Sequence, residues 1–137
     1  DSHGNVNTSK VGAMLTGCGG FINITQNAKK VVFVGTFTVK GLSCSIGGGK
    51  ITITSEGKVR KFVSRVNQIS FSGDYARKKG QPVLYITERA VFALKEDGLH
   101  LLEIAPGIRL EEDILAHMDF KPIVGPDLKI MDREIFT

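Results

Sequence analysis

Short blocks of apolar residues, separated by glycine, proline and charged positions, divide this chain into predicted strands and helices. Residues 31–39 (VVFVGTFTV) are rich in β-branched and aromatic side chains, which predicts a buried strand. Residues 42–46 and 51–54 alternate apolar and polar side chains on either side of the glycines at 47–49, a pattern typical of a β-hairpin. One face of this hairpin is expected to be apolar and the other polar.

The second half of the chain predicts another group of strands. Residues 83–86 and 90–94 are apolar blocks, and Thr87-Glu88-Arg89 interrupts them. Asp97-Gly98 predicts a hairpin turn that returns the chain as a strand over residues 99–104. Hairpin connections of this kind indicate that part of the sheet is antiparallel.

Three segments predict helices. In residues 21–30 the apolar side chains that can share one face are Phe21, Ile22, Ile24 and Ala28. A second, short helix is expected to begin at the cap Ser72, run through Lys79 and end at Gly80. The spacing of Leu110, Ile114, Leu115 and Met118 predicts an amphipathic helix with acidic residues in its first turn.

The alternation of helices with strands predicts an α/β fold in which helices layer on an open, mixed sheet with hairpin-connected strands. Residues 59–66 have helical spacing but are β-branched, so their type stays open. Pro122 and Pro126 punctuate what is expected to be an extended tail. At 137 residues, the chain is predicted to form one domain, 1–137. Its start at Asp1 favours a processed product or an excerpt of a longer protein.

Composition narrows the function classes. No stretch approaches the roughly 20 apolar residues that span a bilayer, which argues against a membrane partner. The formal charge is +4, but no basic run is interleaved with aromatic residues, so nucleic acid is not expected as a partner. The two cysteines, Cys18 and Cys44, lack a disulfide framework, which favours a cytoplasmic location. The histidines are isolated from each other and from both cysteines, so no metal site is expected.

A glycine-rich loop running into a helix is the strongest candidate for chemistry. Gly17-Cys18-Gly19-Gly20 leads directly into Phe21, the first residue of the predicted helix. Such a junction directs unpaired backbone N–H groups and the positive end of a helix dipole at one point. An anion or a developing oxyanion suits this geometry, although glycines also make ordinary tight turns.

Side-chain chemistry is weakly represented. Glu88 is a possible nucleophile, but the adjacent Arg89 favours a structural salt bridge. His100 and Glu103 lie on the same predicted strand, and period-two alternation places them on opposite faces. His117, beside Met118, is expected at the surface. No lysine follows the glycines as in a nucleotide-binding loop, so hydrolysis of nucleoside triphosphates is not indicated.

Several motifs, in order along the whole chain, resemble the C-terminal part of family I coenzyme A (CoA) transferases. The resemblance is closest to the acetate/propionate/acetoacetyl branch, in which two halves are fused into one polypeptide. The matching stretches are DSHGNVN (1–7), GCGGF (17–21), VFVGTFT (32–38), GKVRKFV (57–63), YITERAVF (85–92) and LHLLEIAPG (99–107).

This resemblance implies transfer of CoA from an acyl-CoA to a short-chain carboxylic acid, by way of a glutamyl-CoA thioester. The family's nucleophilic glutamate belongs to a Glu-x-Gly segment upstream of this chain and has no counterpart in residues 1–137. Glu88 matches a later family motif, where its implied role is structural. The implied partners are acyl-CoA and carboxylate substrates, the remaining N-terminal part of the parent enzyme, and further copies in a homo-oligomer. No permanently bound cofactor is implied.

The resemblance also assigns roles to individual residues. The last glycine of the family's Gly-x-Gly-Gly matches Gly20, whose N–H would stabilise an oxyanion on the thioester carbonyl. Gly17 and Gly19 would let the backbone approach the substrate, and Phe21 is assigned to the same binding segment. Asn7, with Asn5, matches a G-N-x-N segment in which loop hydrogen bonding is expected before ligand contact.

The chain alone is therefore expected to be inactive, because a backbone donor without an attacking carboxylate cannot form the intermediate. One alternative is a noncatalytic binding or assembly module of the same fold. This module would be indifferent to the missing part of the enzyme. Another is acyl-CoA hydrolysis, which would proceed without an acceptor acid and is distinguished by product analysis.

Overall fold

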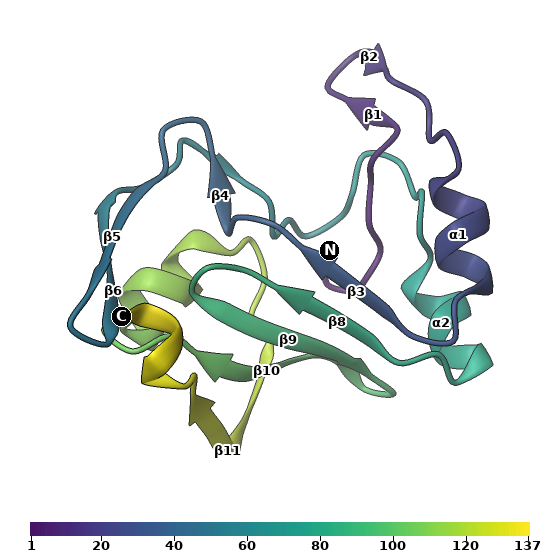
Figure 1. The fold of residues 1–137 in the computed structure, drawn as a ribbon. Helices are drawn as coiled ribbons and strands as arrows, with labels where there is room; N and C mark the ends of the chain where they lie inside the picture. Colours follow the sequence, from purple (N-terminus) through teal and green to yellow (C-terminus); the bar gives the residue numbers. More distant parts are fainter.

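A computed structural model describes residues 1–137 and shows a twisted five-stranded sheet with short helices and hairpins around it (Figure 1). The strands are β1 (Lys10–Val11), β2 (Met14–Leu15), β3 (Val31–Val34), β4 (Thr38–Val39), β5 (Ser43–Gly47), β6 (Lys50–Ser55), β7 (Val59–Arg60), β8 (Val83–Ile86), β9 (Ala90–Lys95), β10 (Gly98–Ile104) and β11 (Ile123–Ile130). The helices are α1 (Phe21–Asn27) and α2 (Gly73–Lys79), with the helical turns η1 (Leu110–Ile114), η2 (Leu115–His117) and η3 (Arg133–Phe136).

The sheet is mixed, with strand order β11-β10-β9-β8-β3. Strands β8, β9 and β10 follow one another as antiparallel hairpins, whereas β3 pairs in parallel with β8 and β11 pairs in parallel with β10. This confirms the predicted α/β fold with an open mixed sheet and hairpin-connected strands. Three two-stranded ribbons, β1-β2, β4-β7 and β5-β6, lie outside the sheet.

One face of the sheet carries most of the core. Eighteen buried apolar residues form a single cluster. In its centre, Phe37 and Phe92 are fully buried, and the Phe62 ring lies 4.8 Å from each of them. The 59–66 segment, whose type the sequence left open, begins as β7 and continues without regular structure, which lets Phe62 reach this cluster.

Helix α2 begins and ends where the sequence predicts. The Ser72 hydroxyl accepts a hydrogen bond from the Tyr75 amide (3.2 Å). Gly80 ends the helix in the left-handed conformation, with φ of 69°. An acidic first turn and a basic last turn complement the helix dipole. The cap, the terminator and the charged residues all lie within α2 or next to it, so the local sequence alone predicts where this helix begins and ends.

Replacing Ser72 by alanine is expected to lower the free energy of unfolding by about 1 kcal/mol, because the Tyr75 amide loses its capping acceptor. Urea unfolding measures this change. Ser72→Asp, which retains an acceptor, is the matched control and should cost less. Equal stability of the alanine variant and the native chain would contradict the capping role.

A bulge in β10 overturns the predicted opposition of His100 and Glu103. On β9, Leu101 pairs with Phe92 and Glu103 pairs with Val91, so Leu102 is an extra residue. This insertion reverses the alternation, and His100 and Glu103 lie on the same face. They still make no mutual bond: the His100 imidazole is 2.6 Å from the Asp97 carboxylate. The hairpin turn is also one residue earlier than expected, because Gly98 pairs with Lys95.

Residues 31–39 form two strands instead of one. The chain leaves the sheet after Val34, and β4 pairs with β7 in a separate ribbon. The prediction that the whole run is buried is wrong, because β3 is the last strand of the sheet and Val32 and Val34 are exposed. The 43–55 hairpin is confirmed, but only Ile51 in it is fully buried, and Ile46 is exposed.

The predicted apolar face of α1 is only partly correct, because Phe21 and Ala28 pack against the core but Ile22 and Ile24 do not. Ile22 and Ile24 are exposed, while Thr25 is the buried residue of the helix. Thr25 satisfies its hydroxyl by donating to the Phe21 carbonyl (2.8 Å), so its burial leaves no polar group unpaired. Phe21 stacks on Phe33, with ring centroids 5.9 Å apart. Sequence spacing found the helix but only part of the face it buries.

The segment 110–118 is helical but not one α-helix. It forms a π-helical turn followed by a 3₁₀ turn, and it buries Ile114 and Met118 as expected. The Asp113 carbonyl accepts a hydrogen bond from Arg89 (3.0 Å), which competes with a continuous helical ladder. The expected extended tail is β11, and its position at the sheet edge tolerates Pro126.

Candidate functional site

The glycine loop adopts conformations that need glycine. Gly17 and Gly19 have φ of 76° and 49°, in the left-handed region that other residues rarely adopt. Gly20 is the N-cap of α1, with φ of −81°, which any residue adopts. A Cβ atom at Gly17 or Gly19 would meet nothing within 4 Å. These two glycines are therefore required by backbone conformation within this chain, whereas Gly20 is not.

Some backbone donors at this loop are free, and others are bonded within the chain. The Gly20 amide, like that of Ile22, has no hydrogen-bond acceptor within the chain. The Phe21 amide is used internally, because it donates to the Cys18 carbonyl (3.0 Å). The loop is open to solvent: Gly17, Gly19 and Gly20 are exposed and Cys18 is half-buried. The loop therefore presents a backbone donor that nothing in residues 1–137 satisfies.

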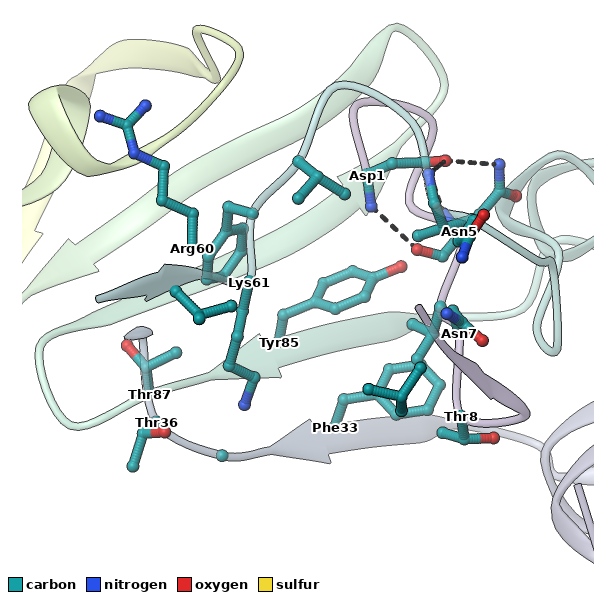
Figure 2. Close-up of a pocket in the computed structure, with 18 of the residues that line it drawn as sticks. Asp1, Asn5, Asn7, Thr8, Phe33, Thr36, Arg60, Lys61, Tyr85 and Thr87 are labelled. Atoms are coloured by element: carbon teal, nitrogen blue, oxygen red, sulfur yellow. Dashed lines mark hydrogen bonds between the residues drawn. The ribbon is translucent and has the colours of Figure 1, made fainter. Parts of the chain in front are cut away.

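A cavity of about 750 Å³ lies at the carboxyl ends of the parallel strands β3 and β8, and Phe21, which follows the glycine loop, lines it (Figure 2). Residues 34–36 and 86–87 line it where the two strands end. Open α/β sheets commonly bind ligands at this end of their strands. Of the predicted site residues, Phe21 and Asn7 line the cavity, whereas Gly17, Gly19 and Gly20 do not.

Aromatic rings form the cavity wall. Phe33 stacks on Tyr85 with ring centroids 5.4 Å apart, and Phe21 also stacks on Phe33. Burial raises the pKa of Tyr85, and its hydroxyl donates a hydrogen bond to the Gly4 carbonyl. The phenol is therefore neutral and anchors the N-terminal segment, and it is not a general base.

The cavity is also cationic. Four basic side chains line it, and Asp1 is its one acidic residue. Arg60 is paired with Asp119 (2.8 Å), but Lys10, Lys61 and Arg65 form no ion pair. Figure 2 shows the Lys61 side chain extending toward the end of β3. An elongated ligand with an anionic group and an apolar body would match this lining.

Asn5 and Asn7 hold the loop, as the sequence predicts. The Asn5 side-chain oxygen accepts from the Gly73 amide (2.9 Å). The Asn7 oxygen accepts from the Ser9 and Lys10 amides, 3.1 Å each, and its amide donates to the Lys10 carbonyl. The side-chain oxygen and amide of Asn7 are therefore both bonded to the turn that precedes β1, although Asn7 also lines the cavity.

A buried cation pairs with Glu88, which sequence analysis considered as a nucleophile, and with a second carboxylate. Arg89 is fully buried and its guanidinium lies 2.7 Å from Glu88 and 2.6 Å from Glu56. Glu88 also accepts from the Phe37 amide (2.8 Å). This confirms that Glu88 is a structural ion-pair partner. Glu56, which the sequence did not single out, is the second partner, and His117 is half-buried 3.6 Å from it rather than at the surface.

The network sets the charge of its members. Burial of the Glu56 carboxylate raises its pKa, but hydrogen bonds from Arg89, Thr38 and the Gly57 amide outweigh burial and hold the pKa at about 2. Burial lowers the pKa of Arg89, and its two glutamate partners more than compensate and raise it. Glu56 and Arg89 are therefore charged at neutral pH, and neither is poised to exchange a proton.

Replacing Glu56 by glutamine is expected to lower the free energy of unfolding at pH 7 by about 2 kcal/mol, because a charged hydrogen bond to Arg89 is lost. The folded pKa of about 2 lies below the ordinary 4.5, so this stabilisation is present above pH 4.5 and disappears as the pH falls toward 2. Unfolding measured across this range should show the two proteins converging at low pH. Glu112→Gln, at an exposed position, is the control. A pH-independent difference would contradict the assignment.

No other constellation for catalysis is assembled. No group of three or more histidine, cysteine, aspartate or glutamate residues lies close enough to hold a metal ion. Cys18 and Cys44 are both free thiols. No helix has the length and apolar character that a membrane span requires.

Comparison with known proteins finds relatives that are named CoA-transferases. The chain is 52% identical over 136 residues to acetate CoA-transferase YdiF of Escherichia coli O157:H7, covering 99% of this chain and 26% of that protein. It is 49% identical over 142 residues to caffeate CoA-transferase of Acetobacterium woodii, covering 27% of it. A crystal structure described as the E. coli O157:H7 acyl-CoA transferase YdiF in a thioester complex with CoA superposes with a TM-score of 0.97 at 51% identity. No family model matches the chain.

This chain is homologous to one segment of the CoA-transferases. It spans about a quarter of the length of the curated relatives it matches. The match extends over the whole of residues 1–137 in the superposed structure, which confirms both the resemblance to family I CoA-transferases and the fold it implies.

Proposed function

We propose that this chain is part of a CoA-transferase that moves CoA from an acyl-CoA to a short-chain carboxylic acid. The observation that carries the proposal is the 52% identity to an acetate CoA-transferase over nearly the whole chain. The relative crystallised as a thioester complex with CoA supports CoA as the group transferred. The unbridged cysteines are compatible with a cytoplasmic enzyme, and homo-oligomerisation is part of the same proposal.

In the proposed reaction, a glutamate outside this chain attacks the thioester carbonyl and expels CoA thiolate, leaving an acyl-glutamyl anhydride. The thiolate then attacks the glutamyl carbonyl and releases the acyl group as a carboxylate, which gives a glutamyl-CoA thioester. The acceptor carboxylate reverses the two steps. Each addition forms a tetrahedral oxyanion that requires preorganised donors.

We assign the Gly20 N–H to this oxyanion. Its amide is free of internal acceptors, and it is exposed at the start of α1. Gly17 and Gly19 give the loop its left-handed turns, and Phe21 joins the loop to the cavity wall. Lys10, Lys61 and Arg65 supply positive charge for the phosphates of CoA. Asn7 supports the site by fixing the adjacent turn.

The test is a chimera in which residues 1–137 replace the matched segment of the E. coli acetate CoA-transferase. We expect the chimera to exchange CoA between acetyl-CoA and a carboxylate, and this chain alone to show none, because it lacks the attacking carboxylate. Gly20→Ala in the chimera should lower kcat by about 100-fold, since a Cβ would displace the carbonyl from the donor.

Gly47→Ala is the matched control, because Gly47 lies in an open part of β5 where a Cβ meets nothing within 4 Å. It should leave kcat unchanged. A chimera that folds, as judged by circular dichroism, but catalyses no exchange would contradict the proposed function. Exchange by the isolated chain would contradict the assignment of the nucleophile to another segment.

A further inference from the structure

The Lys61 ammonium lies in the cavity at the end of β3. Lys61 is an exposed residue of the irregular segment that follows β7, and Figure 2 shows its side chain extending across the cavity toward β3. A Cβ atom at Gly35 would lie only 2.8 Å from the Lys61 Nζ atom, so the glycine leaves room for the ammonium beside the backbone. The nitrogen is therefore at the carboxyl ends of β3 and β8, where open α/β sheets commonly bind ligands.

No acidic side chain neutralises Lys61. It forms no ion pair. Asp1 is the one acidic residue that lines the cavity. Its carboxylate accepts hydrogen bonds from the backbone amides of His3, Asn5 and Val66 instead, at 3.0, 3.1 and 3.1 Å. No carboxylate of this chain therefore holds the Lys61 nitrogen as a cation, and its neutral amine form is available as a nucleophile.

The same cavity has the features that an acyl-CoA requires. Lys10 and Arg65 add unpaired positive charge for the phosphates, and Phe33 and Tyr85 form an apolar wall for the rest of the molecule. Under the proposed function, the compound that enters this cavity is a thioester. An amine that is held beside a bound thioester reacts as if both groups belonged to one molecule, which raises its effective concentration far above that of a lysine in free solution. The cavity therefore brings a nucleophile and an acyl donor together.

We propose that Lys61 is a site of N-acylation, and that the acyl-CoA bound in the cavity is the donor. The lone pair of the Lys61 nitrogen attacks the thioester carbonyl carbon, the carbon–sulfur bond breaks, and the CoA thiolate takes up the proton that the nitrogen loses. The products are an Nε-acyl-lysine and free CoA, and no oxidant, reductant or further reactant is needed. Acylation by this route depends on the proposed function, which supplies the acyl donor.

Acylation changes the cavity in two ways. The amide carries no charge, so the cavity loses one of its unpaired cations, and the acyl group occupies the space beside Gly35. Both changes weaken the binding of CoA. Because an acceptor carboxylate competes with Lys61 for the acyl group, the modification accumulates when acyl-CoA is abundant and the acceptor acid is scarce. Lys61 thus couples the activity of the site to the supply of its acyl donor.

Lysine-resolved mass spectrometry tests the site in the isolated chain. The chain is incubated with acetyl-CoA at mildly alkaline pH, treated with hydroxylamine to remove thioesters from Cys18 and Cys44, and digested. We expect Lys61 to be acetylated at least about 10-fold faster than Lys58, because only Lys61 lies beside the bound thioester. Lys58 is the matched control, since it is also exposed, precedes Lys61 in the same part of the chain and does not line the cavity.

Two further reagents separate binding from intrinsic reactivity. Desulfo-CoA, which resembles CoA but cannot carry an acyl group, should slow the acetylation of Lys61 to the rate of Lys58. S-acetyl-N-acetylcysteamine, a thioester without the nucleotide, should acetylate both lysines at equal rates. A preference for Lys61 that persists with this small thioester, or that desulfo-CoA leaves unchanged, would overturn the proposal. Equal rates with acetyl-CoA would also overturn it, as would a preference for Lys10, the other lysine that lines the cavity.

The chimera with the E. coli enzyme tests the consequence for activity. Incubation with acetyl-CoA in the absence of an acceptor acid should lower its rate of CoA exchange as Lys61 becomes acetylated. Lys61→Arg retains a positive charge without the reactive amine, so this variant should keep its own initial rate through the same incubation. Equal losses in the two chimeras, or acetylation of Lys61 without a loss, would overturn the regulatory role.

The outcomes also separate acylation from the proposed function. Selective acetylation of Lys61 in the isolated chain, together with a chimera that folds but exchanges no CoA, would refute the proposed function alone. A chimera that exchanges CoA, while neither protein shows selective acetylation of Lys61, would refute acylation at this site alone.

Discussion

Replacing Arg89 by alanine is expected to lower the free energy of unfolding by about 3–5 kcal/mol. The guanidinium is fully buried, and it bonds to Glu56, to Glu88 and to the Asp113 carbonyl. Its removal leaves two partly buried carboxylates without a cation and leaves a cavity beside the Phe37 ring, which lies 4.9 Å from the guanidinium carbon. Urea unfolding followed by far-UV circular dichroism at pH 7 measures the loss.

Two variants separate the charge from the packing. Arg109→Ala removes an arginine that also pairs with acidic neighbours but is two-thirds exposed, so its loss should destabilise the fold far less than the loss of Arg89. Arg89→Met combined with Glu56→Gln and Glu88→Gln should recover part of the lost stability, because no unpaired charge remains. A loss below 1 kcal/mol for Arg89→Ala would show that the network contributes little to the fold.

Elements that depend on neighbouring residues were predicted closely from the sequence. Helix α2 follows from the Ser72 cap and the Gly80 terminator. The β9-β10 hairpin follows from the turn predicted at Asp97-Gly98, although the observed turn is one residue earlier. The free amide of Gly20 was also predicted, because a loop that enters a helix leaves its first donors unpaired whatever the tertiary structure.

Features that depend on contacts between residues far apart in the sequence could not be predicted from it. Arg89 and Glu56 are separated by 33 residues, and only the folded chain places them 2.6 Å apart. The exposure of Val32 and Val34 depends on which strand ends the sheet, and strand composition does not carry that information. The bulge at Leu102 reverses the faces of β10 after a regular alternation, without a glycine or proline to mark it.

The candidate site illustrates the same division. Local signals placed the glycine loop, but the cavity next to it is assembled from the N-terminal segment, the ends of β3 and β8, and the 59–67 loop. Lys61 and Tyr85 meet in one cavity through these long-range contacts. Sequence reasoning therefore identified a donor of the proposed site and missed the cationic, aromatic wall beside it.

Replacing Gly73 by alanine is expected to lower the free energy of unfolding by about 3 kcal/mol, because no space exists for a side chain. A Cβ atom there would lie 2.0 Å from the His3 carbonyl oxygen and 2.9 Å from the Gly4 carbonyl carbon, both backbone atoms that cannot rotate away. The shift would also strain the bond from the Gly73 amide to Asn5 (2.9 Å). The N-terminal segment would separate from α2 as a result.

Amide exchange at Val6 reports this separation directly, because the Val6 amide donates to the Phe71 carbonyl (3.0 Å) across the same contact. We expect faster exchange at Val6 in Gly73→Ala and unchanged exchange in the β5-β6 hairpin, which lies on the opposite side of the molecule from α2 (Figure 1). Gly47→Ala is again the control, since the added methyl group meets open space. Native stability and native exchange at Val6 in Gly73→Ala would mean that the N-terminal segment does not pack on α2 as described. The segment carrying Asn5 and Asn7 would then be free to move, and the fixed turn that supports the cavity wall would be lost with it.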